Sequence, residues 1–170
     1  TLDNDGFSIT IAGSDTRSSE TFTDYARVND FVAGSTGDKI NLLDFDNDDG
    51  TSAITFHAFG TNEIDVGVDN DDVYIFTGES SDLTDVSAII DSIGTIGISA
   101  GDADNDQFYV VINDDGGEIF GLYEVNLAAA VVSGNDLDGD ATSVGTTIEL
   151  LGVIDGNVSA ANASDYFELA

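Results

Sequence analysis

The sequence predicts a mainly β domain, folded as a β-sandwich or in a jelly-roll-like manner, with one short helix. Short apolar runs either alternate with polar residues or are rich in aromatic and β-branched side chains. The chain has no proline, so glycine, asparagine and aspartate must form its turns. A single segment has apolar residues at helical spacing, which favours an irregular antiparallel arrangement over alternating strands and helices.

The expected strands are short and spread along the chain. Three runs alternate apolar and polar residues, namely 7–11, 54–58 and 64–68. Two runs are continuously apolar and predict strands buried on both faces, namely 73–76 and 108–112. The C-terminal part is expected to contain a strand, a helical turn and a last strand, at 147–151, 159–164 and 166–169.

A hairpin and a helix are the clearest local structures. The strands 108–112 and 119–125 flank residues 113–117, a run of asparagine, aspartate and glycine that tolerates positive φ angles. Apolar residues at helical spacing predict a helix over 82–93, capped by Ser81 or Asp82 and ended by Gly94. The segment 127–132 fits either a helix or a strand.

Length and charge limit the classes of protein to consider. The 170 residues suit one domain, 1–170, with a possible sub-boundary near residue 50, and 41% hydrophobic residues are enough for a core. Against 34 acidic residues stand only Arg17, Arg27 and Lys39, for a net charge of -31. No basic patch can be built from three residues, which excludes nucleic acids and insertion into anionic membranes, so cations are the expected partners. Since the chain begins with threonine, we expect a processed end or a fragment of a longer protein.

The acidic residues are mostly aspartate, 27 against 7 glutamates, and they recur in one motif. Asp-Asn-Asp occurs four times, at 3–5, 46–48, 69–71 and 104–106. The copy at 69–71 and the copy at 104–106 extend further, since 68–76 aligns without gaps on 103–111 and both lead into an aromatic strand. Because the copies are unevenly spaced, they predict recurring loops and not a solenoid.

Alternating aspartates suit a hard cation. Residues i, i+2 and i+4 point the same way in extended chain, so such a run aims three carboxylates at one point, and calcium prefers flexible oxygen ligands. The candidate calcium ligands are Asp44, Asp46, Asp48, Asp69, Asp71, Asp102, Asp104, Asp106, Asp136, Asp138 and Asp140. The runs resemble the start of an EF-hand loop but lack its glycine at position six. The alternative for any one of them is a solvated acidic turn.

The chain contains few of the residue arrangements that enzymes use for catalysis. His57 is its single histidine and lies in a predicted strand, where a structural role is expected. Cysteine is absent, which removes disulfides and thiolate chemistry, and no Gly-x-Ser-x-Gly nucleophile turn is present. With 34 carboxylates, a catalytic acidic pair carries no signal. We expect a protein without enzymatic activity.

Two regions resemble a known family. Residues 14–24, 29–34 and 38–42 are similar to the segment that follows the calcium-binding β-roll of RTX (repeats-in-toxin) proteins. Residues 148–153 and 160–169 resemble the C-termini of bacterial proteins exported by type I secretion: an apolar strand, a glycine, small residues, then Asp-Tyr-Phe-Glu-Leu. The resemblance implies an extracellular or cell-surface bacterial protein that binds calcium and carries an uncleaved C-terminal export signal. No intact Gly-Gly-x-Gly-x-Asp repeat is present, so the family's ligands are not transferred.

The sequence therefore predicts an extracellular calcium-binding structural module: a surface-layer, filament or adhesin subunit that assembles with itself or with other extracellular proteins or glycans. One alternative is the non-catalytic C-terminal accessory domain of a secreted hydrolase. The other is a carbohydrate-binding module that uses exposed tyrosines such as Tyr25, Tyr123 or Tyr166.

Overall fold

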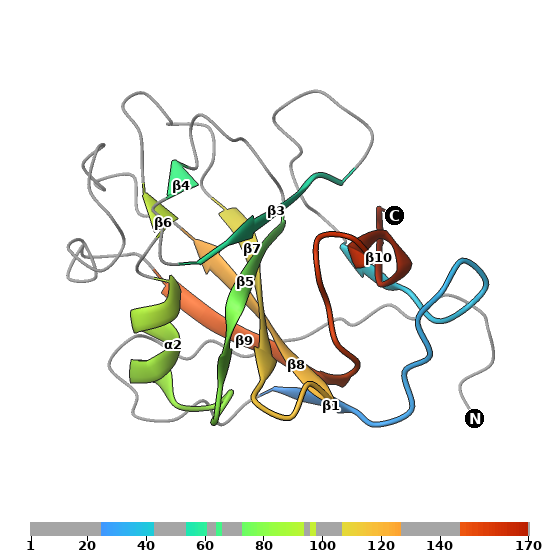
Figure 1. Ribbon diagram of the computed structural model, residues 1–170, viewed down its shortest axis with the longest axis horizontal. Coiled ribbons are helices and arrows are strands. Elements are labelled where there is room, and N and C mark those ends of the chain that lie inside the picture. The colour runs from blue at the N-terminus through green and yellow to red at the C-terminus, as the bar shows by residue number, and fades with distance from the viewer. Residues whose placement is uncertain are drawn as a thin grey trace.

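The structure, a computed structural model, describes residues 25–42, 54–60, 64–65, 73–93, 96–97, 107–126 and 147–169. Within them the chain is mainly β, as predicted. A six-stranded sheet has the order β1-β9-β8-β7-β5-β3, with strands Ala26–Val28, Thr147–Asp155, Ile119–Asn126, Gln107–Asp114, Val73–Ser80 and Phe56–Phe59 (Figure 1). The smaller elements are the paired strands β10 (Phe167–Leu169) and β2 (Ile40–Leu42), the paired strands β4 (Ile64–Asp65) and β6 (Ile96–Gly97), the helix α2 (Val86–Ile93) and the 3-10 turn η1 (Ala163–Asp165).

The prediction of an antiparallel arrangement is wrong. Only β7–β8 and β8–β9 pair antiparallel, while the other five pairings of the described strands are parallel. A parallel pair needs a long crossover, and residues 60–72 and 81–106 connect β3 to β5 and β5 to β7. In the first of these crossovers the described element is the strand β4, so counting predicted helices does not reveal this parallel connection.

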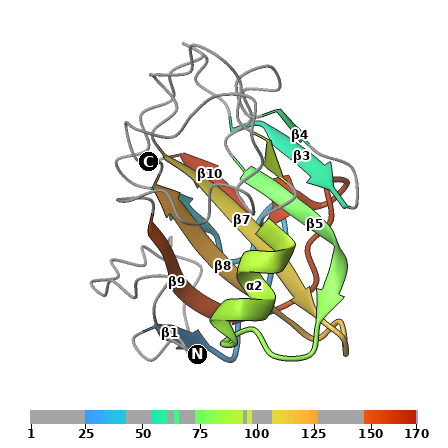
Figure 2. The ribbon, with the colours of Figure 1, turned by 90° about the vertical axis from the view of Figure 1, so that its left-hand side faces the viewer.

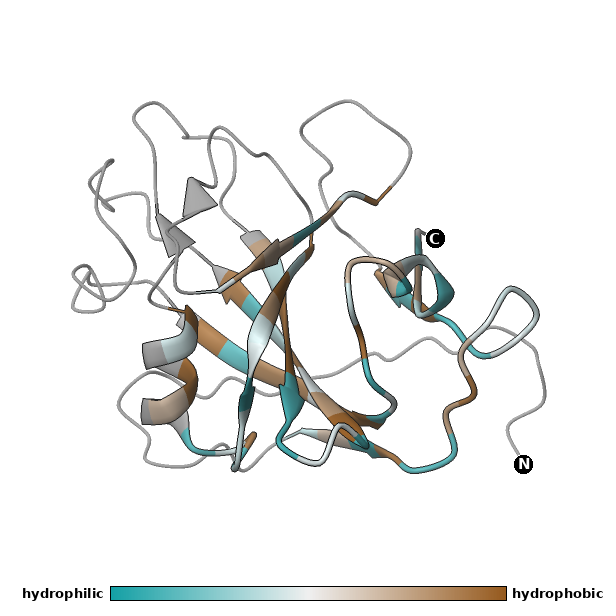
Figure 3. Ribbon diagram, viewed as in Figure 1, coloured by the Kyte–Doolittle hydropathy of each residue, from teal (hydrophilic) through white to brown (hydrophobic). Residues whose placement is uncertain are grey.

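The large sheet is covered on both faces, as the apolar runs at 73–76 and 108–112 predicted. Side chains from Phe108, Val110 and Ile112 pack on one side with Ile89 and Ile93 of α2. Tyr109 and Val111 pack on the other side with Tyr166 and Phe167 of the C-terminal residues. Figure 2 shows α2 in front of the sheet and β10 behind it, and apolar residues follow the central strands in Figure 3. We call residues 156–169, which leave β9 and cover the second face, the closing segment.

A bulge in β9 changes which residues face each side. Tyr123 pairs with Leu150 and Leu122 with Gly152, so Leu151 is an extra residue without an opposite partner. Before the bulge Ile148 and Leu150 face the α2 side, and after it Val153 does, while Ile154 faces the closing segment. Without the bulge, strict alternation would have placed Val153 on the side of the closing segment and Ile154 on the α2 side.

Helix α2 begins later than predicted. The expected cap, Asp82, instead accepts hydrogen bonds from the backbone N–H and the hydroxyl of Thr84, at 2.9 and 2.7 Å. Asp85 caps the helix, since its carboxylate accepts a 3.3 Å bond from the N–H of Ala88. The turn is held to the sheet by Tyr123, whose hydroxyl donates a 2.6 Å bond to the carbonyl of Leu83. Burial, together with the nearby charge of Asp82, raises the pKa of Tyr123 well above its ordinary value.

The predicted hairpin is confirmed. β7 and β8 pair from Gln107–Asn126 to Asn113–Phe120. The turn between them ends at Gly117, which has a φ of 63°, and the N–H of Gly117 donates a 3.0 Å bond to the carbonyl of Asp114. Glycine is favoured there because other residues seldom adopt this backbone conformation.

The remaining predicted elements differ from the structure mostly in their ends. The strands at 54–58 and 147–151 correspond to β3 and β9, the helical turn at 159–164 to the shorter η1, and the last strand to β10. The strand 64–68 is described only as β4. The predicted strand 7–11, the undecided segment 127–132 and the possible sub-boundary near residue 50 lie outside the described residues.

Asn113 is expected to be the most costly polar side chain to remove from this fold. Its amide donates a 2.9 Å bond to the carbonyl of Val158 and accepts a 2.9 Å bond from the N–H of the same residue, both in buried surroundings. Asn113→Ala leaves both backbone groups unpaired and should lower the free energy of unfolding by roughly 2–4 kcal/mol in urea denaturation.

Asn157→Ala is the matched control, because the exposed Asn157 amide makes only a 3.4 Å bond to the carbonyl of Gly117. Its effect should stay within about 0.5 kcal/mol. Equal losses in the two variants would mean that the Asn113 bonds do not hold the closing segment.

Candidate cation-binding end of the sheet

All eleven aspartates predicted to bind calcium lie outside the described residues. The structure therefore gives no distances for them. Within the residues it does describe, no three histidine, cysteine or acidic side chains come close enough together to hold a metal ion. What the structure does define is where the chain segments that carry the aspartates join the sheet.

These segments all join the large sheet at one end. β3, β5 and β7 are parallel, so their first residues Phe56, Val73 and Gln107 lie at the same end. β8 is antiparallel to β7 and ends there at Asn126, and β9 is antiparallel to β8 and begins there at Thr147. Residues 43–53, 66–72, 98–106 and 127–146, which hold the four groups of predicted ligands, each connect to one or two of these strand ends. We call this the acidic end.

Two of the segments share both of their attachment points. Residues 66–72 run from β4 to β5, and residues 98–106 run from β6 to β7. β4 pairs with β6, with Asp65 opposite Gly97, and β5 pairs with β7, with Val73 opposite Tyr109. The segments that carry Asp69 and Asp71 on one side, and Asp102, Asp104 and Asp106 on the other, therefore start next to each other and finish next to each other.

The internal similarity between 68–76 and 103–111 is not a repeat in register. The gap-free alignment places Tyr74 on Tyr109, but in the sheet Tyr74 lies opposite Val110. Tyr74 faces the α2 side and Tyr109 faces the closing segment. A shift of one residue reverses the faces of a strand, so the two segments are neighbours with different side-chain orientation.

Two glutamates at the acidic end were missed by the sequence analysis. Glu124 of β8 and Glu149 of β9 lie directly opposite each other, and both are partly buried. Like charges directly opposite in a sheet repel each other. Local sequence holds no sign of this pair, because only the pairing of β8 with β9 brings the residues together. They add two carboxylates beside the segments that carry the predicted ligands.

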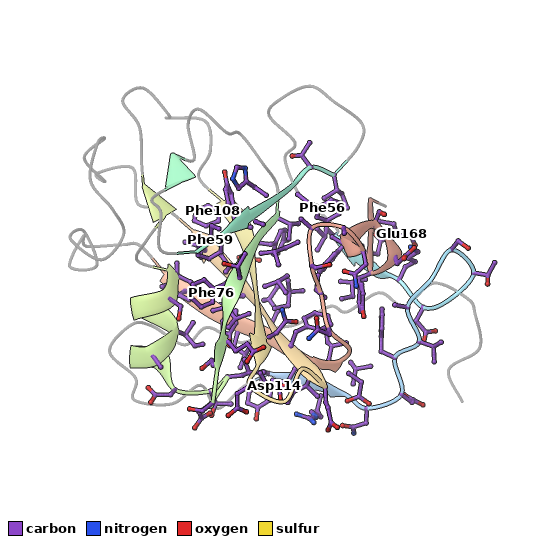
Figure 4. All side chains as sticks on the ribbon, viewed as in Figure 1. Phe56, Phe59, Phe76, Phe108, Asp114 and Glu168 are labelled. Atoms are coloured by element: carbon purple, nitrogen blue, oxygen red, sulfur yellow. The ribbon has the colours of Figure 1, made fainter. Side chains whose placement is uncertain are left out.

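Aspartates at the opposite end of the sheet act differently. Asp114 lies in the turn between β7 and β8, at the far end from Phe108 and Phe56 (Figure 4). Its carboxylate accepts bonds of 2.9 and 3.0 Å from the N–H groups of Glu118 and Ile119. Although desolvation works against it, these backbone hydrogen bonds together lower the pKa of Asp114. Asp114 therefore stabilises its own turn, as expected in the alternative in which an aspartate belongs to a solvated turn and not to a calcium site.

The tyrosines do not form a carbohydrate platform. The prediction of exposed tyrosines is wrong, since Tyr123 is fully buried, Tyr166 is 8% exposed and Tyr25 packs partly buried against the α2-side core. Tyr74 and Tyr109 are buried as well, and these five are all the tyrosines in the chain. The tyrosine rings pack in the two cores together with the apolar side chains, and a ring in a core cannot stack on a sugar.

The basic residues of the described part are engaged with neutral groups. Arg27 donates a 2.8 Å bond to the amide oxygen of Asn29, and Lys39 donates a 2.6 Å bond to the carbonyl of Ser164. His57 is partly buried, with its ring 6.1 Å from that of Tyr74.

No protein-family model matches the chain, no curated protein matches its sequence and no solved structure matches its fold. Among the described helices none is long and apolar enough to cross a membrane.

A substitution at Asp138 is expected to separate an ion ligand from a turn-forming aspartate. Asp138→Ala should weaken calcium affinity and lower stability only when calcium is present, because without the ion it relieves repulsion between Asp136, Asp138 and Asp140. The measurement is the melting temperature of each variant in calcium and in chelator.

Asp114→Ala provides the comparison. Since Asp114 binds backbone N–H groups, its replacement should cost about 1–2 kcal/mol in both conditions. If Asp138→Ala also destabilises equally with and without calcium, Asp138 is structural and not a ligand.

Proposed function

We propose that the chain is an extracellular calcium-binding structural module, a surface-layer, filament or adhesin subunit of a bacterial protein exported by type I secretion, and that it has no catalytic role. The observation that carries the proposal is the common attachment of the acidic segments. Four separate groups of alternating aspartates connect to strand ends at one end of a single sheet. Carboxylates that are distant in sequence are thereby tied to one region, as a multi-ligand calcium site needs.

The charge of the chain supports a need for cations. A net charge of -31 opposes compaction, and three basic residues cannot offset it. Arg27 and Lys39 donate to the neutral oxygens of Asn29 and Ser164. Glu124 and Glu149 add two acidic side chains at the acidic end. Bound calcium offsets this negative charge, and a preference for aspartate over glutamate suits ligands held close to a turning backbone.

The finer fold we propose is sandwich-like. The pair β2–β10 and the large sheet pack across one core, in which Ile40 and Phe167 meet Phe120 and Leu122. The smaller layer has only two short strands, so the sandwich is incomplete, and α2 covers the outer face of the larger one.

The closing segment is also the segment that resembles a type I export terminus. In the fold its Tyr166 and Phe167 are buried, at 8% and 4% exposure. A transporter that reads these residues must therefore meet them before the domain folds. We infer that the segment is recognised in the unfolded chain where calcium is scarce and closes the second core after export, when calcium is available.

The alternative of another class is the accessory domain of a secreted hydrolase. It shares the calcium requirement but not the assembly. Light scattering separates the two, because a structural subunit grows in mass on addition of calcium and an accessory domain stays monomeric.

Calcium is expected to raise the melting temperature, and magnesium to do so much less, because magnesium gives up its water reluctantly and demands a tighter geometry. At free calcium 100 times the dissociation constant, each site adds about 2.7 kcal/mol, which is several degrees for a domain of this size. Calorimetry of the metal-stripped chain, titrated with either ion, measures this. A melting curve that chelation leaves unchanged contradicts the calcium proposal.

Deletion of residues 165–170 is expected to abolish export of the parent protein from its host. The purified domain should also lose stability, because burial of Tyr166 and Phe167 contributes roughly 1.5–3 kcal/mol each. The double substitution Tyr166→Ala/Phe167→Ala keeps the chain length and serves as the stability control. Normal secretion of the truncated parent would show that this is a structural strand and not an export signal.

A further inference from the structure

The closing segment is bound by side chains that lie far from it in the sequence. The ring of Tyr166 stacks on Phe31 at 5.7 Å and meets Phe120 edge-on at 5.6 Å. Phe167 lies 6.4 Å from Phe120 and 6.0 Å from Phe56. Phe56 and Glu168 of β10 are seen on the same side of the sheet in Figure 4. Tyr166 and Phe167 therefore pack against aromatic side chains from the β1–β2 connection, from β3 and from β8.

Polar contacts fix the register of the segment. The N–H of Gly34 donates a 3.0 Å bond to the carbonyl of Asp165, and the N–H of Ile40 donates a 2.7 Å bond to that of Tyr166. Lys39 holds the carbonyl of Ser164, and Asn113 holds Val158 by two bonds. The same contacts can form whether the segment belongs to the same copy of the chain or to another copy.

The joint between β9 and the segment is a glycine in an unusual conformation. Gly156 has a φ of 139°, and a Cβ there would lie 2.7 Å from the ring of Tyr166. Its N–H donates a 2.8 Å bond to the carbonyl of Glu118. Glycine has the widest range of backbone conformations, so a change in the direction of the segment would cost less backbone strain at Gly156 than at a residue with a side chain.

The rest of the described surface has no apolar face for self-association. Val32 is the one large hydrophobic side chain that is mostly exposed among the described residues. Interfaces of stable assemblies have apolar cores, and chains with a net charge of -31 repel each other. The closing segment and the buried residues it packs against form an apolar interface that already exists within one copy.

We propose that copies of this chain assemble by exchanging the closing segment, so that residues 157–169 of one copy pack against Phe31, Phe56 and Phe120 of the next. The exchange reproduces the contacts that residues 157–169 make in the closed form and exposes no further apolar surface, while the backbone changes direction at Gly156, as expected for exchange of an identical element. The proposal rests on the self-assembly in the proposed function and identifies the surface that carries it.

The register of β2 with β10 allows a direct test. Asn41 and Glu168 are opposite each other, which places their Cα atoms at a separation that a disulfide can bridge. The chain has no cysteine, so Asn41→Cys/Glu168→Cys introduces the only pair. Glu168 is exposed to solvent. The buried amide oxygen of Asn41 has no hydrogen-bond partner, so Asn41→Cys removes no hydrogen bond made by that oxygen.

Two orders of treatment distinguish exchange within an assembly from closure within one copy. When calcium is added to the reduced variant first and oxidation follows, exchange predicts a ladder of covalent multimers on a non-reducing denaturing gel. When the dilute variant is oxidised first, each copy is locked on itself and calcium should produce no increase in light scattering until a reductant is added. Asn41→Cys and Glu168→Cys alone, which can form at most dimers, are the controls.

Covalent monomers from a scattering assembly, or assembly of the locked copies at the rate of the reduced ones, would overturn the exchange while leaving calcium-dependent assembly intact. Unchanged scattering of the unmodified chain at any calcium concentration would overturn the self-assembly and the exchange together. A raised melting temperature in that same experiment would still support calcium binding.

Discussion

The central strands β5, β7 and β8 carry buried apolar side chains on both faces of the sheet, so each face has to be covered by another element. α2 covers one face, and the closing segment with β2 covers the other. The anchors of the two covers are different. A tyrosine hydroxyl on the carbonyl of Leu83 holds the turn before α2, while the Asn113 amide and the aromatic contacts of Tyr166 and Phe167 hold the closing segment. The fold therefore has two cores on one sheet, and each core depends on its own cover.

Segregation of charge follows from the same sheet. A sheet with two apolar faces leaves its strand ends and edges for polar groups, and the described strand ends that receive the aspartate-rich segments lie together at one end. Aspartates elsewhere, such as Asp82 and Asp114, bind nearby backbone N–H groups and shape turns. In these described turns the carboxylate of aspartate replaces water as the acceptor for backbone N–H groups.

One group of predicted calcium ligands is linked along the chain to both strands that contact the closing segment, β2 and β3. Residues 43–53, with Asp44, Asp46 and Asp48, join β2 to β3. β2 pairs with β10, and Phe56 at the start of β3 contacts Phe167. In the proposed function, an ion held by this connection would act on the two strands that receive the closing segment. Assembly through that segment would then depend on calcium without a separate calcium bridge between copies.

Local sequence by itself determined the longer strands of the sheet, the hairpin at 113–117, the helix before Gly94 and the double burial of the strands at Val73 and Phe108, but not the short strands β1, β2 and β6. These features depend on contacts between near neighbours and on apolar patterning, and both can be recognised in short runs of sequence. The parallel pairings, the bulge at Leu151, the burial of Tyr123 and Tyr166 and the opposition of Glu124 and Glu149 were decided only by the tertiary structure. Each of them arises from a pairing or a core contact between residues distant in the chain, and no local pattern sets its register or its face.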